Sequence, residues 1–179
     1  MSFNNLGLSP ALLKSVLEKG YTKPSEIQKE AIPEILQGKD ILAGAQTGTG
    51  KTAAFALPLL HKLQNAESKR RRIRVLVLVP TRELASQVGE SFREYGSNLR
   101  FKTSTLYGGV SINTQIDKLK KGVDIVVATP GRLLDHLNQK TLNLSELETF
   151  VLDEADRMLD MGFIRDIKKI LKLSLIHIS

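Results

Sequence analysis

The sequence predicts an α/β fold in which a mostly parallel sheet is covered by helices on both faces. Short apolar runs rich in β-branched residues recur along the chain, and amphipathic helical stretches separate them. Strands that are apolar along their whole length are buried on both sides, as in parallel sheets with helical crossovers. Polar motifs follow four of these runs, at the strand ends where such sheets gather their ligand sites. The expected strands are 41–43, 75–79, 101–106, 123–127 and 150–152.

Two helices are expected before the first strand. Ser9 is a suitable N-cap, Pro10 occupies the first helical position, and an apolar face follows until Gly20 ends the helix. A second helical stretch covers residues 26–36. Because proline lacks the backbone N–H that an interior helical position donates, we expect Pro33 to break or restart this helix.

The other helices are expected between the strands, where each one carries the chain across the sheet to the next parallel strand. No internal repeat or low-complexity linker interrupts this alternation, which favours a single domain. The helical stretches begin and end near 53–57, 82–95, 112–121 and 131–137, and a last one surrounds Met158 and Met161.

The composition excludes several classes of protein and weakly favours a polyanionic partner. The 179 residues contain no Cys, and 26 Lys and Arg stand against 19 Asp and Glu, a net charge of +7. No apolar run reaches membrane-spanning length and the N-terminus lacks a signal-peptide pattern, so we expect a cytoplasmic protein with no membrane segment. The basic run 69–74 is interpreted as a solvated loop in preference to a dedicated RNA contact.

The most informative motif is Ala-Gln-Thr-Gly-Thr-Gly-Lys-Thr at 45–52, between an apolar strand and a helix start. Glycines let the backbone approach a phosphate closely, and the N–H groups of the following helix point at the anion. Lys51 supplies a charge for the β- and γ-phosphates, and the Thr52 hydroxyl can ligate Mg²⁺. The alternative is a chance glycine-rich turn. The expected nucleotide-binding residues are Gln46, Thr47, Gly48, Thr49, Gly50, Lys51 and Thr52.

An acidic motif, Asp-Glu-Ala-Asp, begins at Asp153 directly after the expected strand 150–152. Asp153 is expected to hold Mg²⁺ through water, and Glu154 to orient or deprotonate the water that attacks the γ-phosphate. An acidic surface turn is the alternative for these residues in isolation. With the phosphate loop in the same chain, we predict Lys51, Asp153 and Glu154 as catalytic residues and Thr52 and Asp153 as Mg²⁺ ligands.

These two motifs resemble those of the first RecA-like domain of a DEAD-box ATP-dependent RNA helicase. The sequence is most similar to the bacterial RhlE-type subgroup. The resemblance covers residues 3–171 and includes four more family motifs in the expected order. Residues 20–28 resemble the adenine-recognition motif, with an isolated aromatic residue upstream at Phe3. The three segments that resemble RNA-contacting elements are 80–85, 108–109 and 129–132.

The resemblance implies an adenine site and therefore ATP, with Mg²⁺, as cofactor. The Gln28 carboxamide offers the donor and acceptor that read the N6/N7 edge of adenine, which favours ATP over GTP. Tyr21 and Phe3 are candidates to stack on or enclose the base. Both could instead anchor the N-terminal helix in the core. For Tyr21 the two roles are equally open, and for Phe3 packing is favoured.

The resemblance also implies RNA binding through the sugar-phosphate backbone. The start of the helix after Pro130 presents N–H groups to a phosphate and Arg132 adds charge, so binding should be sequence-tolerant and salt-sensitive. Ordinary turn chemistry is the alternative for the glycines. Arg82 and Glu83 are expected to pair at a helix start. The expected RNA-binding residues are Pro80, Thr81, Arg82, Gly108, Gly109, Thr129, Pro130, Gly131 and Arg132.

The C-terminal residues depart from the family pattern. Family members continue through a loop and a strand to a Ser-Ala-Thr motif and then to a second RecA-like domain, whereas residues 174–179 do not match. We expect residues 1–173 to be a first RecA-like domain that lacks its last strand or strands, with 174–179 as a tail foreign to the family. Because the missing strand would pair centrally, we expect this chain to fold poorly alone. Without the second domain's arginines, we expect no unwinding and very slow ATP turnover.

Two other function classes remain open. One is another superfamily 2 P-loop helicase that acts on DNA, and the other is a non-catalytic module that binds ATP and RNA. The Gln28 motif and the Asp-Glu-Ala-Asp sequence argue against a DNA helicase. The presence of both Lys51 and Glu154 argues against a non-catalytic module. The scattered histidines do not predict a metal site.

Overall fold

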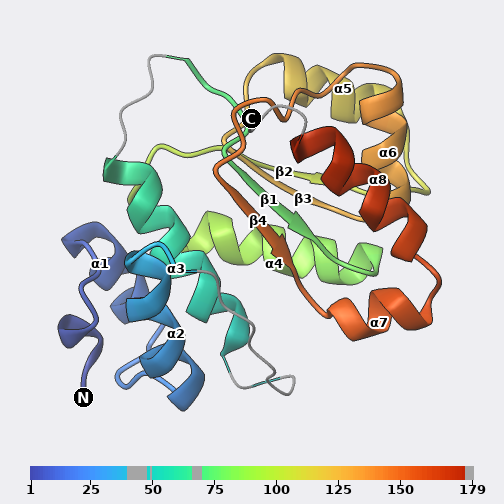
Figure 1. Cartoon of the computed structure of the whole chain (residues 1–179). Helices are drawn as coiled ribbons and strands as arrows, with labels where there is room; N and C mark the ends of the chain where they lie inside the picture. Colours follow the sequence, from blue (N-terminus) through green and yellow to red (C-terminus); the bar gives the residue numbers. More distant parts are fainter. Residues whose placement is uncertain (40–47, 49, 66–69, 176–179) are drawn as a thin grey trace. The chain divides into compact units, whose positions relative to one another are not determined.

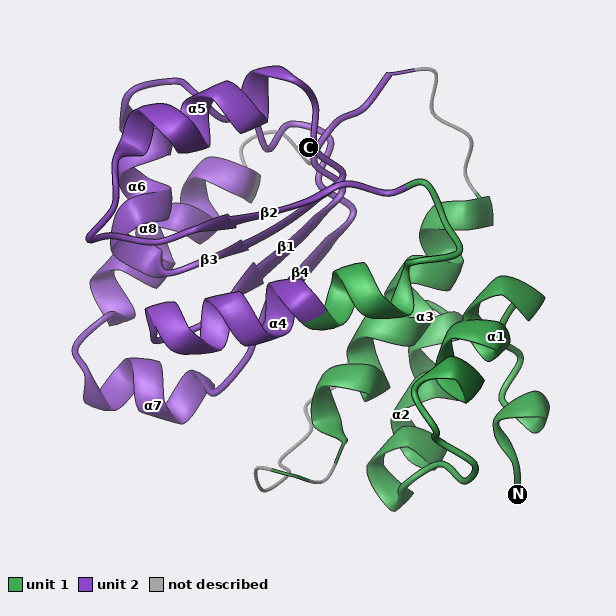
Figure 2. Ribbon diagram, turned by 180° about the vertical axis from the view of Figure 1, so that it is seen from behind, with its two compact units in different colours: residues 1–68, 91–100 green, residues 69–90, 101–179 purple. Residues whose placement is uncertain are grey.

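The chain forms two structural units, which Figure 2 shows in different colours. The computed structural model describes residues 1–39, 48, 50–65 and 70–175. Unit 1 consists of residues 1–68 and 91–100, and unit 2 of residues 69–90 and 101–179. Helix α4 (Arg82–Tyr95) contributes its first part to unit 2 and its last part to unit 1. The expected strand 41–43 lies outside the described residues.

Unit 1 is helical. Its elements are a short 3-10 helix η1 (Phe3–Asn5), α1 (Pro10–Glu18), α2 (Glu26–Leu36) and α3 (Lys51–Asn65). Helices α1 and α2 both pack against α3 (Figure 1). The core of this unit includes Phe92 from the end of α4, whose ring centroid lies 6.2 Å from that of Phe55 on α3. As predicted, α1 begins at Pro10 directly after its N-cap Ser9.

The predicted break at Pro33 is wrong, because α2 continues through this residue. Only the N–H of residue 33 is missing from the helix, and the Gln37 N–H donates to the Pro33 carbonyl oxygen at 3.1 Å. Ala31 and Ile32, on the neighbouring turn, are 6% and 0% exposed. Burial of this face offsets the cost of an interior proline, which is about 3 kcal/mol.

Unit 2 contains a four-stranded sheet of order β2-β3-β1-β4, in which every described pair is parallel. The strands are β1 (Val75–Leu78), β2 (Thr103–Leu106), β3 (Ile125–Ala128) and β4 (Thr149–Leu152). The first residues of all four strands are in register, since Val75 pairs with Ile125 and Thr149, and Thr103 pairs with Ile125. Their carboxyl ends therefore meet along one edge of the sheet.

Helices cover both faces of this sheet, as the sequence predicts. Helices α6 (Pro130–Asn138) and α8 (Ile164–Leu175) lie on one face, and the first part of α4 lies on the other (Figures 1 and 2). The remaining helices of the unit are α5 (Ile112–Lys120) and α7 (Ala155–Asp160). Met158 is fully buried in the core, whereas Met161 is half exposed. Among the described helices, none is long and apolar enough to cross a membrane.

Candidate functional site

The predicted phosphate loop is described only at its C-terminal end, in unit 1. Gln46, Thr47 and Thr49 lie outside the described residues. Gly48 and Gly50 have φ values of +85° and +80°, in the left-handed region that glycine adopts without strain. Lys51 and Thr52 are the first two residues of α3. The described part thus has glycines with left-handed backbone angles ahead of a helix N-terminus, and such a helix start favours an anion.

Gln28 joins the start of α2 to this glycine turn. Its side chain is buried, and its Nε2 donates to the Gly50 carbonyl oxygen at 3.1 Å. Its Oε1 accepts from the backbone N–H of Ser25 at 3.0 Å, so Gln28 also caps α2. A Cβ on Gly50 would lie 2.3 Å from Nε2, so a larger residue there would displace the Gln28 amide. One amide hydrogen and one lone pair of Gln28 are left for a ligand.

The two predicted aromatic residues differ in exposure. Phe3 is 5% exposed and packs in the core, which agrees with the role that the sequence favours for it. Tyr21 is 46% exposed, so part of this side chain is open to a ligand.

Tyr21 also affects a neighbouring tyrosine. Burial is the main cause that raises the pKa of Tyr95 above its ordinary value, and the nearby Tyr21 hydroxyl raises it further.

The acidic motif lies in unit 2 at the end of β4. Asp153 is 4% exposed, and its backbone N–H donates to the Leu78 carbonyl oxygen at 2.9 Å. Glu154 has φ of 55° and ψ of 49°, a left-handed conformation that is uncommon for a residue with a Cβ. Such backbone strain, of about 1–3 kcal/mol, gathers at functional sites. Arg157 Nη1 donates to Glu154 Oε2 at 3.4 Å, so the carboxylate lies at the start of α7.

No group of three or more His, Asp or Glu side chains that could hold a metal ion occurs in the described part of the chain. The predicted Mg²⁺ ligands are a carboxylate and a hydroxyl, which are oxygen donors of the kind that Mg²⁺ prefers. Mg²⁺ keeps several waters and takes further oxygens from phosphates, so Asp153 of unit 2 and Thr52 of unit 1 are each, taken separately, chemically suitable ligands.

The three predicted RNA-contacting segments follow three adjacent strands of unit 2. Thr81 follows β1, the Gly108-Gly109 pair follows β2, and Thr129 follows β3, which pairs with both of the other strands. Thr81 and Thr129 are partly exposed, and the three glycines of these segments are exposed. The neighbouring prolines, Pro80 and Pro130, are buried and shape the turns. The fold thus brings the three segments together at one sheet edge.

The expected pair between Arg82 and Glu83 is wrong, because the Arg82 guanidinium lies over the ring of Tyr107 at 5.1 Å from the centroid. Adjacent residues of a helix do not face one another, whereas the tyrosine after β2 lies within reach of the arginine after β1. Gly109 has φ of +79°, and a Cβ there would lie 3.1 Å from Arg82 Nη1. The backbone angle favours glycine at this position, and a side chain there would displace the tip of Arg82.

A buried polar network, which the sequence did not predict, connects the loop after β2 with α5 and α6. Gln115 on α5 is 5% exposed, and its Nε2 donates to the Tyr107 carbonyl oxygen at 2.9 Å. Its Oε1 lies 3.2 Å from Arg132 Nη1 and 2.9 Å from His136 Nε2. His136 is fully buried, and its Nδ1 lies 2.8 Å from the Thr141 hydroxyl. The sequence feature that could have predicted this network is the position of Gln115 and His136, two polar residues on the inward faces of amphipathic helices.

The histidine in this network makes the stability of the chain depend on pH. Burial first, and then the Arg132 guanidinium, lower the pKa of His136 below its ordinary value, although Asp135 acts in the opposite direction. The unfolded chain, with a pKa of about 6.5, then binds protons that the folded chain does not. We expect the free energy of unfolding to be constant above this pKa and to fall as the pH drops below it.

Urea unfolding between neutral pH and about pH 5.5 measures this dependence. We expect His136→Asn to flatten the loss of stability at low pH, whatever its effect at neutral pH. Burial also lowers the pKa of His61, so His61→Asn is the matched variant that removes the other contribution. An unchanged slope in His136→Asn would contradict the prediction.

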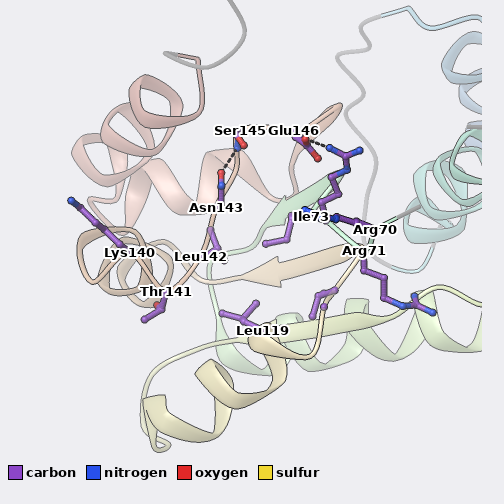
Figure 3. Close-up of a pocket in the computed structure, with 13 residues that line it drawn as sticks. Arg70, Arg71, Ile73, Leu119, Lys140, Thr141, Leu142, Asn143, Ser145 and Glu146 are labelled. Carbon is purple, nitrogen blue, oxygen red and sulfur yellow. Dashed lines mark hydrogen bonds and ion pairs between the residues drawn. The ribbon is translucent and has the colours of Figure 1, made fainter. Parts of the chain in front are cut away.

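The basic run lines a cavity of about 400 Å³ at the amino ends of β1 and β3 (Figure 3). Three of its arginines pair with acidic residues of the same unit. Arg71 Nη1 lies 2.6 Å from Asp124 Oδ2, Arg72 pairs with Glu146, and Arg74 Nε donates to Glu148 Oε1 at 2.9 Å. These pairs hold the loop before β1 against its neighbours. Arg74 is 4% exposed, so this end of the run is buried and not solvated as predicted, because its guanidinium pairs with Glu148.

Known proteins align with most of this sequence. A family model described as DEAD/DEAH box helicase matches residues 25–177. The DEAD-box ATP-dependent RNA helicase CshA of Bacillus cereus is 54% identical over 170 residues, which are 95% of this chain and 32% of that protein. The DEAD-box ATP-dependent RNA helicase RhpA of Helicobacter pylori is 51% identical over 169 residues, which are 94% of this chain and 34% of that protein.

One solved structure is closely similar in fold. The crystal structure of a DEAD box protein from the hyperthermophile Methanococcus jannaschii superposes with a TM-score of 0.90 at 46% sequence identity. The match covers 97% of this chain and 47% of that one. The chain spans about a third of the length of the curated relatives, since the aligned residues are 32% and 34% of them.

Proposed function

This chain belongs to the DEAD/DEAH box helicase family, and we propose that it forms the ATP-binding and RNA-binding first domain of an ATP-dependent RNA helicase. The observation that carries the proposal is that the three segments predicted to contact RNA meet at the carboxyl ends of β1, β2 and β3. Membership in the RhlE-type subgroup and a cytoplasmic location are further proposals that rest on the sequence.

RNA is proposed to bind along this sheet edge through its backbone. The exposed glycines at 108, 109 and 131 let a phosphate approach the main chain closely, and the N-terminus of α6 presents N–H groups and a partial positive charge. Thr81 and Thr129 add hydroxyl groups. Groups of this kind contact phosphate and sugar and do not read base edges, so RNA of any sequence should bind.

The nucleotide is proposed to be ATP, with residues of each unit in separate roles. In unit 1, Gln28 reads the adenine and Lys51 neutralises phosphate charge. In unit 2, Asp153 holds Mg²⁺ through water, and Glu154 accepts a proton from the attacking water. Mg²⁺, when bound, withdraws charge from the phosphate oxygens. The left-handed backbone of Glu154 supports a functional role for its carboxylate, since strain of this kind persists where function needs it.

A second RecA-like domain is proposed as the partner of this one, which is consistent with the length of the relatives. Arginines from that domain would stabilise the charge that develops on the γ-phosphate, and an arginine finger is worth about 10³–10⁵ in rate. We therefore expect this chain alone to show no unwinding and very slow ATP turnover. Turnover that RNA stimulates many-fold in this chain alone would contradict that expectation.

Nucleotide specificity tests the proposed ATP site. We expect the chain with Mg²⁺ to bind fluorescent ADP more tightly than fluorescent GDP, and Gln28→Ala to reduce ADP affinity by about tenfold, because hydrogen bonds to the adenine edge are lost. Gln37→Ala, at the exposed C-cap of the same helix, is the matched control. Circular dichroism must show that both variants are folded. Equal ADP and GDP affinities in a folded wild-type chain would overturn the adenine site.

Two comparisons separate the proposal from its alternatives. Binding of single-stranded RNA and DNA of the same sequence, measured in competition, tests for a DNA helicase, which would not prefer RNA. Addition of a second RecA-like domain from a relative tests for a non-catalytic module. Restored ATP turnover supports the enzyme, and continued absence of turnover supports the module.

A further inference from the structure

We propose that Gln115 is a positioning residue for RNA binding, which holds the 107–110 loop in its RNA-contacting shape without touching RNA itself. The inference rests on the proposed RNA-binding function. Gln115 itself lies on α5, outside all three of the proposed RNA-contacting motifs.

The Gln115 carboxamide joins three elements of unit 2. Its Nε2 donates to the Tyr107 carbonyl oxygen, at the start of the loop after β2. Its Oε1 accepts from Arg132 Nη1 and from His136 Nε2, both on α6. The side chain itself comes from α5. One buried group therefore fixes the loop, α5 and α6 relative to one another.

The orientation of this carboxamide is fixed by its partners. Arginine nitrogens only donate hydrogen bonds and a carbonyl oxygen only accepts, so Oε1 must face Arg132 and Nε2 must face Tyr107. His136 adds to this constraint, because its Nε2 faces the same Oε1 and must carry its proton there. The Thr141 hydroxyl on Nδ1 holds the imidazole from its other side. If the amide were rotated, its NH₂ group would face Arg132 Nη1 and the protonated His136 Nε2, and no hydrogen bond could form between these donors.

The second end of the loop is held through the same arginine. Arg132 Nη1 donates to the Val110 carbonyl oxygen at 3.1 Å as well as contacting Gln115. The Arg132 side chain is only 13% exposed, and its Nε lies 3.7 Å from Asp135 Oδ2. Nη1 is thus committed to the protein and Nε faces Asp135, so the donors left for a phosphate are those of Nη2.

The residues between these two anchors are Gly108 and Gly109, which are exposed. Glycine has more backbone freedom to lose than any other residue, so a free Gly-Gly segment would have to be ordered when RNA binds. Anchors at Tyr107 and Val110 order it beforehand, which removes that cost from the binding free energy. Gln115 thereby raises RNA affinity from behind the RNA surface.

The test compares two variants that remove the anchor in different ways. Gln115→Met keeps the side-chain volume and loses every hydrogen bond. Gln115→Glu keeps acceptors for Arg132 and His136 but has no donor for the Tyr107 carbonyl oxygen. Gln139→Met, at the exposed C-cap of α6, is the matched control. Anisotropy of fluorescein-labelled decauridine at about 50 mM salt gives the RNA affinity of the full chain.

We expect both Gln115 variants to weaken decauridine binding by about tenfold and to leave ADP affinity unchanged, while Gln139→Met binds as the wild type does. Amide hydrogen exchange should increase at residues 107–110 in the same variants. If only one variant folds, that variant carries the test. A purely structural role would lower the unfolding free energy and leave the RNA affinity of the folded protein unchanged.

Decauridine affinity within twofold of wild type in either folded Gln115 variant overturns the inference and leaves the proposed function intact. Failure of the folded wild-type chain to bind decauridine at all overturns the proposed RNA binding and the inference with it. The two failures are therefore distinguishable in one experiment.

Discussion

Glu154→Gln is expected to reduce ATP turnover by about 10²–10⁴-fold while nucleotide affinity stays near that of the wild type. Glutamine has the shape of glutamate but cannot accept a proton, so the attacking water would lose its general base. Because this chain alone should turn over very slowly, the assay is made after a second RecA-like domain from a relative is added. Phosphate release in the presence of RNA gives the rate.

Glu30→Gln is the matched control for this variant, because Glu30 is exposed on α2, lies outside every motif and has no role in the proposed chemistry. We expect it to leave turnover unchanged. Turnover of Glu154→Gln within about threefold of wild type would show that Glu154 is not the base, since a positioned base contributes far more than that. Its left-handed backbone and its contact with Arg157 would then need a structural explanation.

Phe92→Ala is expected to lower the free energy of unfolding by about 3–5 kcal/mol, a large fraction of the stability of a domain. Phe92 is 1% exposed and packs beside Phe55 in unit 1. Truncation would remove the apolar contact and leave a cavity, because the surrounding helices can relax only in part. Urea denaturation followed by circular dichroism measures the loss.

Leu17→Ala, at a residue that is 67% exposed in the same unit, should change the unfolding free energy by no more than about 0.5 kcal/mol. A loss below about 1 kcal/mol for Phe92→Ala would mean that the ring is not packed as the structure shows. The wild-type curve, measured in parallel, is the reference for both variants.

The positions of the strands and helices follow closely from the sequence because their signals are local. Helix α4 covers the residues predicted for it, and the four described strands lie within two residues of the predicted runs at each end. The error at Pro33 has a physical cause. A proline penalty is a local quantity, whereas the burial that outweighs it depends on α3, which packs against α2 from beyond the phosphate loop.

The sequence by itself determined the motifs, since a glycine turn before a helix and an acidic pair after a strand can be recognised from adjacent residues. The tertiary structure decided which side chains support them. Arg82 lies over Tyr107, and Gln115 meets both Tyr107 and Arg132. These partners are far apart in the chain and meet only because the strand order β2-β3-β1 brings the following loops together. Local patterning fixes where a strand begins and ends, but its neighbours are chosen by long-range packing.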